Sequence, residues 1–344
     1  MSRAKCWILL CGLLACVCTA ALAQSKGKLQ MYFVDVEGGQ STLFVTPAGE
    51  SLLIDTGWPD SNGRDADRIV AAAKKAGISK IDYVLITHFH TDHVGGVPQL
   101  VARIPVGTFI DHGPNRETSD AVTEHGYEAY QQVLSTGKYG HIVAKPGEVL
   151  PIKGMRVLVI SADGNLIDHP LPGAGEANEY CKASETRAAD QTENARSLGV
   201  LITFGKLRIL DLGDLTWDKE MQLMCPVNKL GHINILVVSH HGWYQSSSPA
   251  LVDAIHPQVA IMDNGATKGG SKVTLETFKK VPGLETLWQL HYSEEGGPDN
   301  TQEAYIANPQ GPDNGNDLEL TAAQDGSFSV LNPRTGASKS YEAR

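Results

Sequence analysis

The 344-residue sequence has no excess of positive charge, no long apolar run beyond its first 23 residues and few cysteines. Lys and Arg number 29 against 39 Asp and Glu, a net charge of -10, so the chain lacks the basic face that a non-specific grip on nucleic acid or anionic lipid requires. Four cysteines lie near the N-terminus, which leaves only Cys181 and Cys225 in the body. Two cysteines are too few for a disulfide scaffold or a thiolate zinc site.

The N-terminus resembles an export signal. A short basic start precedes an apolar run from Trp7 to Val17, and small residues follow before Gln24. This layout is typical of a secretory signal peptide, and the run is too short for a comfortable membrane span. We therefore predict that residues 1–23 are cleaved and that the protein is periplasmic or extracellular. A retained anchor and a lipoprotein cleavage site at Cys16 are the alternatives.

Residues 24–344 read as one α/β domain. Apolar β-rich runs alternate with segments of helical spacing, and the last two runs form a closing hairpin. This alternation suits helices that flank two packed sheets. Predicted strands cover 29–36, 41–46, 51–54, 80–87, 155–160, 199–204, 207–212, 233–238, 259–262, 285–290, 318–321 and 327–331, and predicted helices cover 65–76, 118–134, 248–255 and 274–281.

One segment, 163–193, is long, polar and rich in Gly, Pro and Ala. Disorder is one interpretation, but a long irregular loop inside a compact domain more often borders a binding site. Cys181 lies within this segment. Export would permit a disulfide between Cys181 and Cys225, and the alternative is two unpaired or incidentally paired cysteines.

The strongest chemical signal is a histidine cluster that follows the apolar strand 80–87. His88, His90, Asp92 and His93 fall within six residues. Histidine is the commonest side-chain ligand of zinc, and aspartate supplies a hard oxygen donor. At a strand end His88 and His90 share one direction, whereas the following turn lets Asp92 and His93 approach from another side. The pattern therefore predicts a metal site with room for two ions.

The run from His88 to His93 resembles the HxHxDH signature of the metallo-β-lactamase superfamily. The resemblance extends from about residue 31 to at least residue 291. It implies an α/β fold of four layers, an αββα sandwich, with one or two metal ions at the sheet edges. It also implies that Asp55, in the run 53–57, supports the histidine loop from behind the metal ligands.

Two further motifs of the superfamily have counterparts here. The run 210–214 resembles the strand-end motif whose final aspartate, Asp214 in this chain, bridges two metals. The run 237–242 resembles the last motif, whose histidine completes the second metal site. His240 directly follows the predicted strand, so we assign it to the metal, and we expect His241 to contact substrate or donate a proton.

Within the superfamily the chain is most similar to the hydrolase domain of DNA-uptake competence-channel proteins and to secreted phosphorylcholine esterases. The similarity rests on the runs 34–36 and 38–41, on Asn194 with 197–198, and on the double histidine before Gly242. Competence-channel proteins carry many membrane helices, whereas the sequence predicts none in this chain after its signal. The resemblance therefore implies a hydrolase, and DNA translocation is not carried over.

The chain departs from the superfamily at one ligand. Glyoxalases and true β-lactamases have a further histidine ahead of the bridging aspartate, and the run 160–165 has none. Competence-type members lack it too. His169 is a poor substitute because a flexible loop places ligands badly, and Asn194 is either a neutral donor or a capping residue. His291, at the end of a late strand, is a second residue that could face the same cleft.

The ligand set implies a metal-activated hydroxide. We expect two divalent ions, zinc or alternatively manganese, and we expect Asp92, Asp214 and His241 to carry the catalysis. A phosphodiester or phosphate ester, small or envelope-linked, is the predicted substrate, and the acidic charge disfavours long nucleic acids. A thioester or lactam hydrolase is the first alternative, and a non-catalytic metal- or envelope-binding protein is the second. The predicted ligands are His88, His90, Asp92, His93, Asp214 and His240.

Overall fold

The computed structural model describes residues 27–59 and 61–344. The predicted signal peptide, the start of the mature chain near Gln24 and the alternative lipid site at Cys16 therefore lie outside the described residues. Within the described part, no helix is long and apolar enough to cross a membrane.

The first sheet has nine strands in the order β18-β17-β16-β1-β2-β3-β4-β5-β6. Strands β3 to β6 run parallel, whereas the other neighbours are antiparallel, so the C-terminal strands extend the sheet beside β1. The strands are β1 (Leu29–Phe33), β2 (Thr42–Val45), β3 (Ser51–Ile54), β4 (Ile81–Leu85), β5 (Val106–Asp111), β6 (Gly140–Val143), β16 (Leu318–Ala322), β17 (Ser327–Asn332) and β18 (Ala337–Glu342).

The second sheet also has nine strands, in the order β15-β14-β13-β12-β11-β10-β8-β7, with β9 paired to β8. Strands β11 to β15 run parallel, and β7 to β10 pair antiparallel. The strands are β7 (Val149–Leu150), β8 (Arg156–Ala162), β9 (Asn165–Leu166), β10 (Gly199–Phe204), β11 (Leu207–Asp211), β12 (Ile235–Val237), β13 (Val259–Met262), β14 (Thr286–His291) and β15 (Ile306–Asn308).

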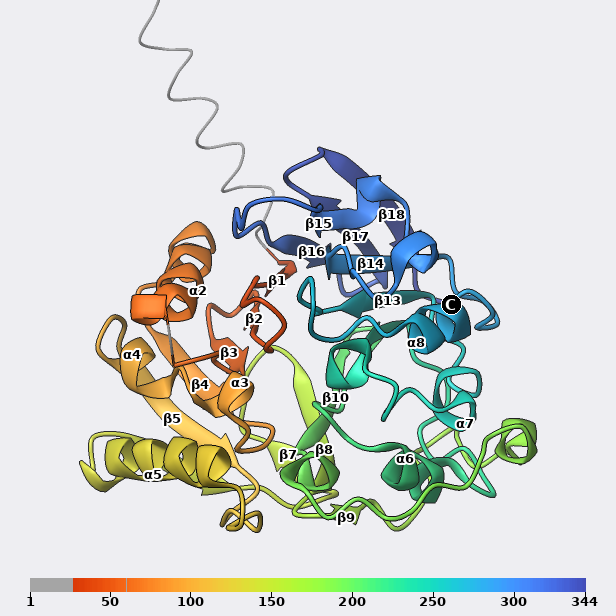
Figure 1. Cartoon of the computed structure of the whole chain (residues 1–344), viewed down its shortest axis with the longest axis horizontal. Helices are drawn as coiled ribbons and strands as arrows, with labels where there is room; N and C mark the ends of the chain where they lie inside the picture. Colours follow the sequence, from red (N-terminus) through yellow and green to blue (C-terminus); the bar gives the residue numbers. More distant parts are fainter. Residues whose placement is uncertain (1–26, 60) are drawn as a thin grey trace, which may run out of the picture.

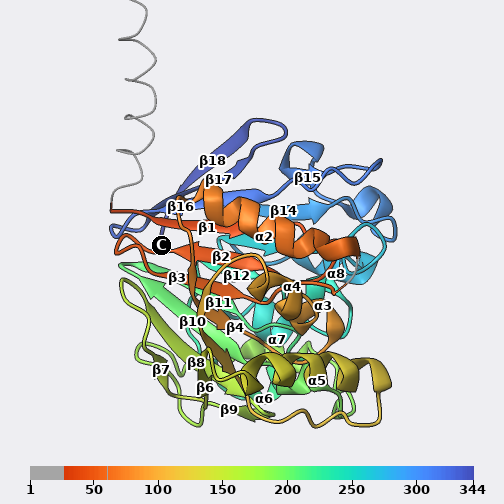
Figure 2. The ribbon, with the colours of Figure 1, turned by 90° about the vertical axis from the view of Figure 1, so that its left-hand side faces the viewer.

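Helices cover the outer face of each sheet. Figure 1 shows α2, α4 and α5 on one side of the molecule and α6, α7 and α8 on the other, and Figure 2 shows the first group in front of its sheet. The helices are α2 (Arg64–Lys75), α3 (Thr91–Val94), α4 (Val97–Val101), α5 (Ala121–Ser135), α6 (Trp217–Met224), α7 (Pro249–Val252) and α8 (Lys272–Phe278), with short 3-10 turns η1 (Ser61–Gly63), η2 (Glu179–Lys182), η3 (Glu193–Arg196), η4 (Ser239–Gly242), η5 (Gly297–Asp299) and η6 (Glu303–Tyr305).

Local sequence explains the longer helices. In α2, Ala66, Ile69 and Ala73 recur at helical spacing and are buried against the first sheet. Acidic residues occupy its first turn and lysines its last, which complements the helix dipole. Helix α5 begins where the Asp120 carboxylate accepts a hydrogen bond from the Thr123 amide at 2.8 Å.

Three buried apolar clusters correspond to the three interfaces between four layers. One joins the inner faces of the two sheets, one lies under α2, α4 and α5, and one lies under α6, α7 and α8. Phe44 of β2 and Trp288 of β14 belong to the central cluster, which shows that both sheets contribute to it. The predicted αββα sandwich is confirmed.

The structure adds detail to two features of the sequence prediction. The expected C-terminal hairpin forms as β16 and β17, and a third strand, β18, extends it. Cys181 of η2 and Cys225, which caps the end of α6, form a disulfide, so the segment 163–193 is tied to the second layer of helices.

The topology brings the predicted site residues to one edge of the sandwich. The histidine loop follows β4, Asp214 follows β11, and His240 and His241 follow β12. Each of these strands has a parallel neighbour, and the loops at carboxyl ends of parallel strands form the crevices in which α/β proteins bind ligands.

Candidate metal centre

The loop after β4 is folded tightly against the end of β3. Thr56 donates both its amide and its hydroxyl to the His93 carbonyl at 2.8 Å. Gly96 must lack a side chain, because a Cβ there would lie 2.1 Å from the Thr56 carbonyl oxygen. This contact holds α3, which carries Asp92 and His93, at the boundary between the two sheets.

Four donor groups from both halves of the chain converge. Donor atoms of Asp92, His93, Asp214 and His241 all lie within 4.8 Å of one another, and all four residues are buried. Asp92 Oδ2 is 3.3 Å from His93 Nε2 and 3.2 Å from His241 Nε2. The Asp214 carboxylate is 3.4 Å from His93 Nε2 and 3.5 Å from His241 Nε2.

The Asp214 carboxylate also faces a second group of histidines. Its Oδ2 atom lies 3.4 Å from His240 Nε2 and 3.9 Å from His88 Nε2. His88 is fully buried, and its ring centroid lies 4.7 Å from that of His90. Asp214 is therefore the one carboxylate of this cluster that both histidine groups share.

Burial and neighbouring charges shift the pKa values of Asp214 and of the histidines beside it. Burial and the neighbouring His93 and His90 hold the pKa of His88 well below its ordinary value, and burial lowers the pKa of His240 to about 4. Burial alone would raise the pKa of Asp214, but His240 and His93 hold it well below its ordinary value. Both histidines are thus neutral lone-pair donors at neutral pH, beside an ionised carboxylate.

The opposite direction holds for the other two histidines. Burial disfavours their charge, but the carboxylates of Asp92 and Asp214 raise the pKa of His93 and of His241. Their Nε2 atoms are 3.2 Å apart, so they cannot both direct a proton at each other. A cation between these atoms would replace the shared proton and balance the carboxylates.

Two groups behind the cluster fix the orientation of its histidines. His93 Nδ1 donates to Asp55 Oδ2 at 2.7 Å, and Asp55 also accepts hydrogen bonds from the Thr87 amide and hydroxyl. This pairing leaves Nε2 of His93 to face the cluster. The structure thus places Asp55 where the sequence analysis expects it.

Sequence reasoning missed the second group. His90 Nε2 pairs with Glu117 Oε2 at 3.0 Å, which leaves Nδ1 as the ring nitrogen for a ligand. Glu117 also accepts a hydrogen bond from the Glu193 amide, and the Glu193 carboxylate accepts one from the Arg116 amide. Glu117 and Glu193 lie in loops with no motif, so spacing gave no signal for them.

The segment that carries Asn194 continues into two residues that are hydrogen-bonded to the ligand loops. Its 3-10 turn ends next to Leu198, whose amide donates to the Thr87 carbonyl at 2.7 Å, and Ser197 Oγ accepts a hydrogen bond from the Asp214 amide. Asn194 Oδ1 is buried without a partner. Thr192 caps this turn, so the Asn194 side chain is not the cap. His169 is exposed on the long loop.

His291 lies in a different cluster. Its Nε2 atom pairs with Asp35 Oδ1 at 2.7 Å and lies 3.6 Å from Glu37. Burial disfavours its charge, but the Asp35 bond raises the pKa of His291. The Arg68 guanidinium contacts the same Asp35 carboxylate at 3.2 Å, so this group is already balanced by an arginine.

The turn after β12 places both His240 and His241 against Asp214. Each residue has a positive φ, 56° and 54°, which is rare for side chains of this size. The His240 amide donates to the Gly213 carbonyl, and the Gly270 amide donates to the His241 carbonyl, so the surroundings hold this backbone. The sequence reading kept His241 outside the metal shell, whereas the structure groups its Nε2 with Asp92, His93 and Asp214.

These residues fit a metal site. His88 Nε2 and Asp214 Oδ1 are buried and have no hydrogen-bond partner. Buried polar atoms seldom stay unpaired, and neutral imidazoles with carboxylates are the ligands that zinc prefers.

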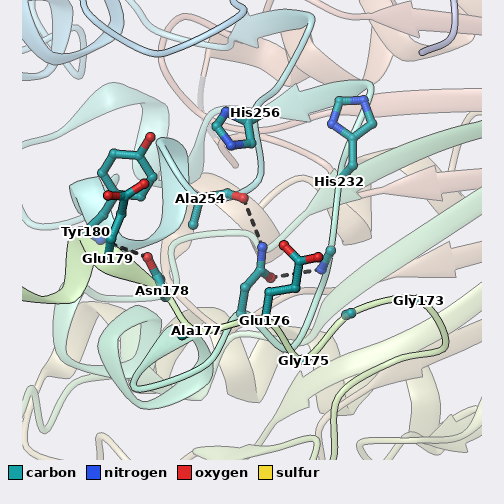
Figure 3. Close-up of a pocket in the computed structure, with 13 residues that line it drawn as sticks. Gly173, Gly175, Glu176, Ala177, Asn178, Glu179, Tyr180, His232, Ala254 and His256 are labelled. Carbon is teal, nitrogen blue, oxygen red and sulfur yellow. Dashed lines mark hydrogen bonds between the residues drawn. The ribbon is translucent and has the colours of Figure 1, made fainter.

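A pocket beside the segment 173–180 is separate from the metal cluster. It has a volume of about 320 Å³ and lies between the segment Gly173–Tyr180 and the histidines His232 and His256 (Figure 3). Its two asparagine side chains are used by backbone groups: Asn178 bonds the Met224 and Ala250 carbonyls, and Asn228 bonds the Ala254 carbonyl. None of its lining residues belongs to the metal cluster.

Comparison with known proteins identifies the fold. Residues 35–184 match the model of the metallo-beta-lactamase superfamily, and this match includes the histidine loop. The chain contains a metallo-beta-lactamase superfamily domain. A UPF0173 metal-dependent hydrolase from Cupriavidus taiwanensis is 24% identical over 268 residues, which cover 75% of this chain and 82% of the relative. The chain is therefore similar in sequence to a metal-dependent hydrolase of this superfamily.

Two other relatives match over shorter parts of their length, and a solved structure matches over most of its length at low identity. Recombination protein 2 of Haemophilus influenzae is 26% identical over 242 residues, which cover 70% of this chain but only 25% of that protein. Hydroxyacylglutathione hydrolase of Stenotrophomonas maltophilia is 31% identical over 105 residues, 30% of this chain and 37% of that one. A metallo-beta-lactamase fold protein from Bacillus subtilis aligns with a TM-score of 0.47 at 14% identity, over 77% of this chain and 96% of the other.

Proposed function

We propose that this chain is an exported metal-dependent hydrolase that cleaves a phosphodiester or phosphate ester. The observation that carries the proposal is the position of Asp214, whose single carboxylate faces two separate groups of imidazole nitrogens. Two ions at such a centre, a few ångströms apart, suit the in-line displacement at phosphorus, where attacking and leaving oxygens both need positive charge.

The ligands divide into two sets. His88, His90 and His240 would hold one ion, Asp92, His93 and His241 would hold the other, and Asp214 would contribute to both. Asn194 is a candidate neutral donor for the first set. Zinc is the first ion to test and manganese the second, because both accept imidazole and carboxylate ligands. When bound, such ions lower the pKa of a coordinated water and polarise the phosphoryl oxygen.

The residues of the chain itself hold and orient the donors. Asp55 fixes the ring of His93, and Glu117 fixes the ring of His90. Access is from one side, because 22% of the His90 side chain and 10% of the His240 side chain are exposed, against none of His88. The Trp243 ring stacks beside His240 with centroids 6.3 Å apart. Substrate would therefore approach between His90 on one side and the His240–Trp243 pair on the other.

The acidic charge of the chain supports a small or envelope-linked ester over a long nucleic acid. A thioester or lactam hydrolase is the second candidate. The partial match to a hydroxyacylglutathione hydrolase favours a thioester. A non-catalytic metal- or envelope-binding protein would retain metal and show no turnover on any substrate.

A substrate panel tests the proposal. The mature protein is loaded with zinc or manganese and assayed on bis(p-nitrophenyl) phosphate, a phosphomonoester, a thioester and a lactam. We expect phosphoester turnover, and Asp214→Asn should lower kcat at least about a hundredfold, or roughly 2.7 kcal/mol of transition-state stabilisation. Activity on the thioester or lactam alone would refute the substrate class and leave the metal centre standing.

Export has a separate test. N-terminal sequencing of the protein made in its native host should find a start near Gln24 in the periplasmic or extracellular fraction. Retention of Met1 on a cytoplasmic product would refute export, and a lipid-modified Cys16 would identify a membrane-anchored form.

A further inference from the structure

Lys268 lies at the mouth of the cluster on a loop that no sequence motif singles out. The loop joins β13 to α8 and is fastened to the histidine turn, because the Gly270 amide donates to the His241 carbonyl at 2.8 Å. Gly269 has a φ of +76°, and a Cβ there would lie 2.2 Å from the His241 carbonyl oxygen. The position of Lys268 is therefore set by the same turn that places His241.

The Lys268 side chain crosses from the second half of the chain to the first. Its Nζ donates to the Gly38 carbonyl at 2.8 Å and forms an ion pair with Asp92 Oδ2. The Trp58 ring centroid lies 5.5 Å from Nζ. These contacts use loops from both sheets, so the ammonium is held at a defined place beside the metal cluster.

The ammonium has capacity for one more acceptor. An ammonium has three N–H donors, and among the described residues only Gly38 and Asp92 accept from Lys268. The Lys268 side chain is 28% exposed, against 8% for Asp92, so the remaining donor lies toward solvent. An acceptor that enters the site from outside can reach it.

The partner of Lys268 is also the oxygen that faces the cluster. Asp92 Oδ2 lies 3.3 Å from His93 Nε2 and 3.2 Å from His241 Nε2. An ion bound by these groups would share Asp92 Oδ2 with Lys268, and the attraction between lysine and carboxylate would weaken. The ammonium would then gain most from an anionic oxygen beside that ion.

We propose that Lys268 is a substrate-binding residue that holds an anionic oxygen of the phosphate group. This inference rests on the proposed function, and it gives the reason why a chain of net charge -10 would accept an anionic substrate. One lysine and the ions of the proposed centre would supply local positive charge on a chain whose net charge is negative.

The test compares Lys268→Met, which keeps the apolar stem, with Lys268→Arg and with Lys279→Met. Lys279 is the matched control, because it also pairs with one aspartate, Asp299, at 2.6 Å, and it lies just after helix α8, outside the cluster. Each metal-loaded protein is measured for metal content, for binding of inorganic phosphate by calorimetry, and for KM and kcat on bis(p-nitrophenyl) phosphate.

We expect Lys268→Met to keep its metal and to weaken phosphate binding roughly ten- to a hundredfold, the usual worth of a hydrogen bond to a charged group. KM should rise by a similar factor with a smaller change in kcat, Lys268→Arg should restore much of the binding, and Lys279→Met should match the wild type. If the wild type is active and Lys268→Met has unchanged phosphate binding and KM, the role of Lys268 is refuted and the proposed function still stands.

Two other outcomes are distinct. Loss of metal from a folded Lys268→Met protein would show that the lysine positions Asp92, and it would overturn a substrate-binding role. A wild-type protein that neither binds phosphate nor cleaves any phosphoester would refute the proposed function, and the inference with it.

Discussion

Replacement of Asp55 by Asn should weaken metal binding without removing a single proposed ligand. The Asp55 carboxylate is fully buried and accepts hydrogen bonds from His93 Nδ1 at 2.7 Å and from the Thr87 amide and hydroxyl at 2.8 and 2.7 Å. Asn fits the site, because it has the same shape and tolerates the positive φ of 60° at this position. The amide group of the asparagine can still form a hydrogen bond with Thr87.

The amide changes the proton on His93. If the asparagine NH₂ faces Nδ1, this nitrogen must become an acceptor, and the proton moves to Nε2. The lone pair that points into the cluster is then lost. Loss of such an orienting carboxylate typically costs ten- to a hundredfold in metal affinity, or about 1.4–2.8 kcal/mol. Because one buried charged hydrogen bond is lost, stability should also fall by about 1–3 kcal/mol.

Asp111→Asn is the control for this experiment. Asp111 is a buried aspartate at the end of the neighbouring strand β5, and it pairs with His141 Nε2 at 2.7 Å and Tyr130 at 2.8 Å, outside the metal cluster. Zinc affinity is measured by competition with a chromogenic chelator, and stability by urea unfolding. A folded Asp55→Asn protein that binds zinc as tightly as the wild type, or an equal loss of affinity in Asp111→Asn, would refute the reasoning.

Three further predictions follow from other contacts. Burial raises the pKa of Asp317 to about 7 from 3.8. The folded protein therefore loses stability as pH rises from about 4 toward 7 and this buried carboxyl must ionise. The unfolding free energy of Asp317→Asn should match that of the wild type near pH 4 and exceed it at pH 8 by up to about 4 kcal/mol. Reduction of the Cys181–Cys225 disulfide, which closes a separation of 44 residues, should lower unfolding free energy by up to about 4 kcal/mol, and an unchanged Tm in reductant would contradict this. His240→Ala and His241→Ala should each lose one metal equivalent by elemental analysis, and full metal content in either would exclude that histidine as a ligand.

Strongly periodic segments of the fold are readable from sequence. The helix predicted over 65–76 is α2 (Arg64–Lys75), because its apolar residues recur at helical spacing and glycine follows its end. The strand predicted over 80–87 contains β4, which is mostly apolar. Both elements bury one face, and the spacing of apolar residues along the sequence predicts which face that is.

Edge strands and short helices were missed for a physical reason. Strand β18 buries only Tyr341, and β6 buries none of its four residues fully. These strands form through backbone pairing with a neighbour, so their side chains carry little apolar signal. Helix α6 has the same difficulty, since it mixes acidic and apolar residues over only eight positions.

The candidate site was predictable where ligands follow strands. The histidine loop follows β4 and Asp214 follows β11. Both strands end at the same edge of the sandwich, so these residues lie close together. The orientation of His241 was not predictable, because it depends on two consecutive left-handed residues rather than on strand alternation. Glu117 and Lys268 reach the cluster from distant loops, and no local pattern marks such long-range partners.

In the proposed centre, the Asp214 carboxylate joins two groups of metal-binding histidines. The most direct test is the zinc stoichiometry of the wild-type protein and of Asp214→Asn, measured by equilibrium dialysis and elemental analysis, with folding checked by circular dichroism. We expect two ions per wild-type chain and one per folded Asp214→Asn chain, because Asn removes the negative charge between two cations. Two ions retained in Asp214→Asn, or no ion bound by the wild type, would contradict the account.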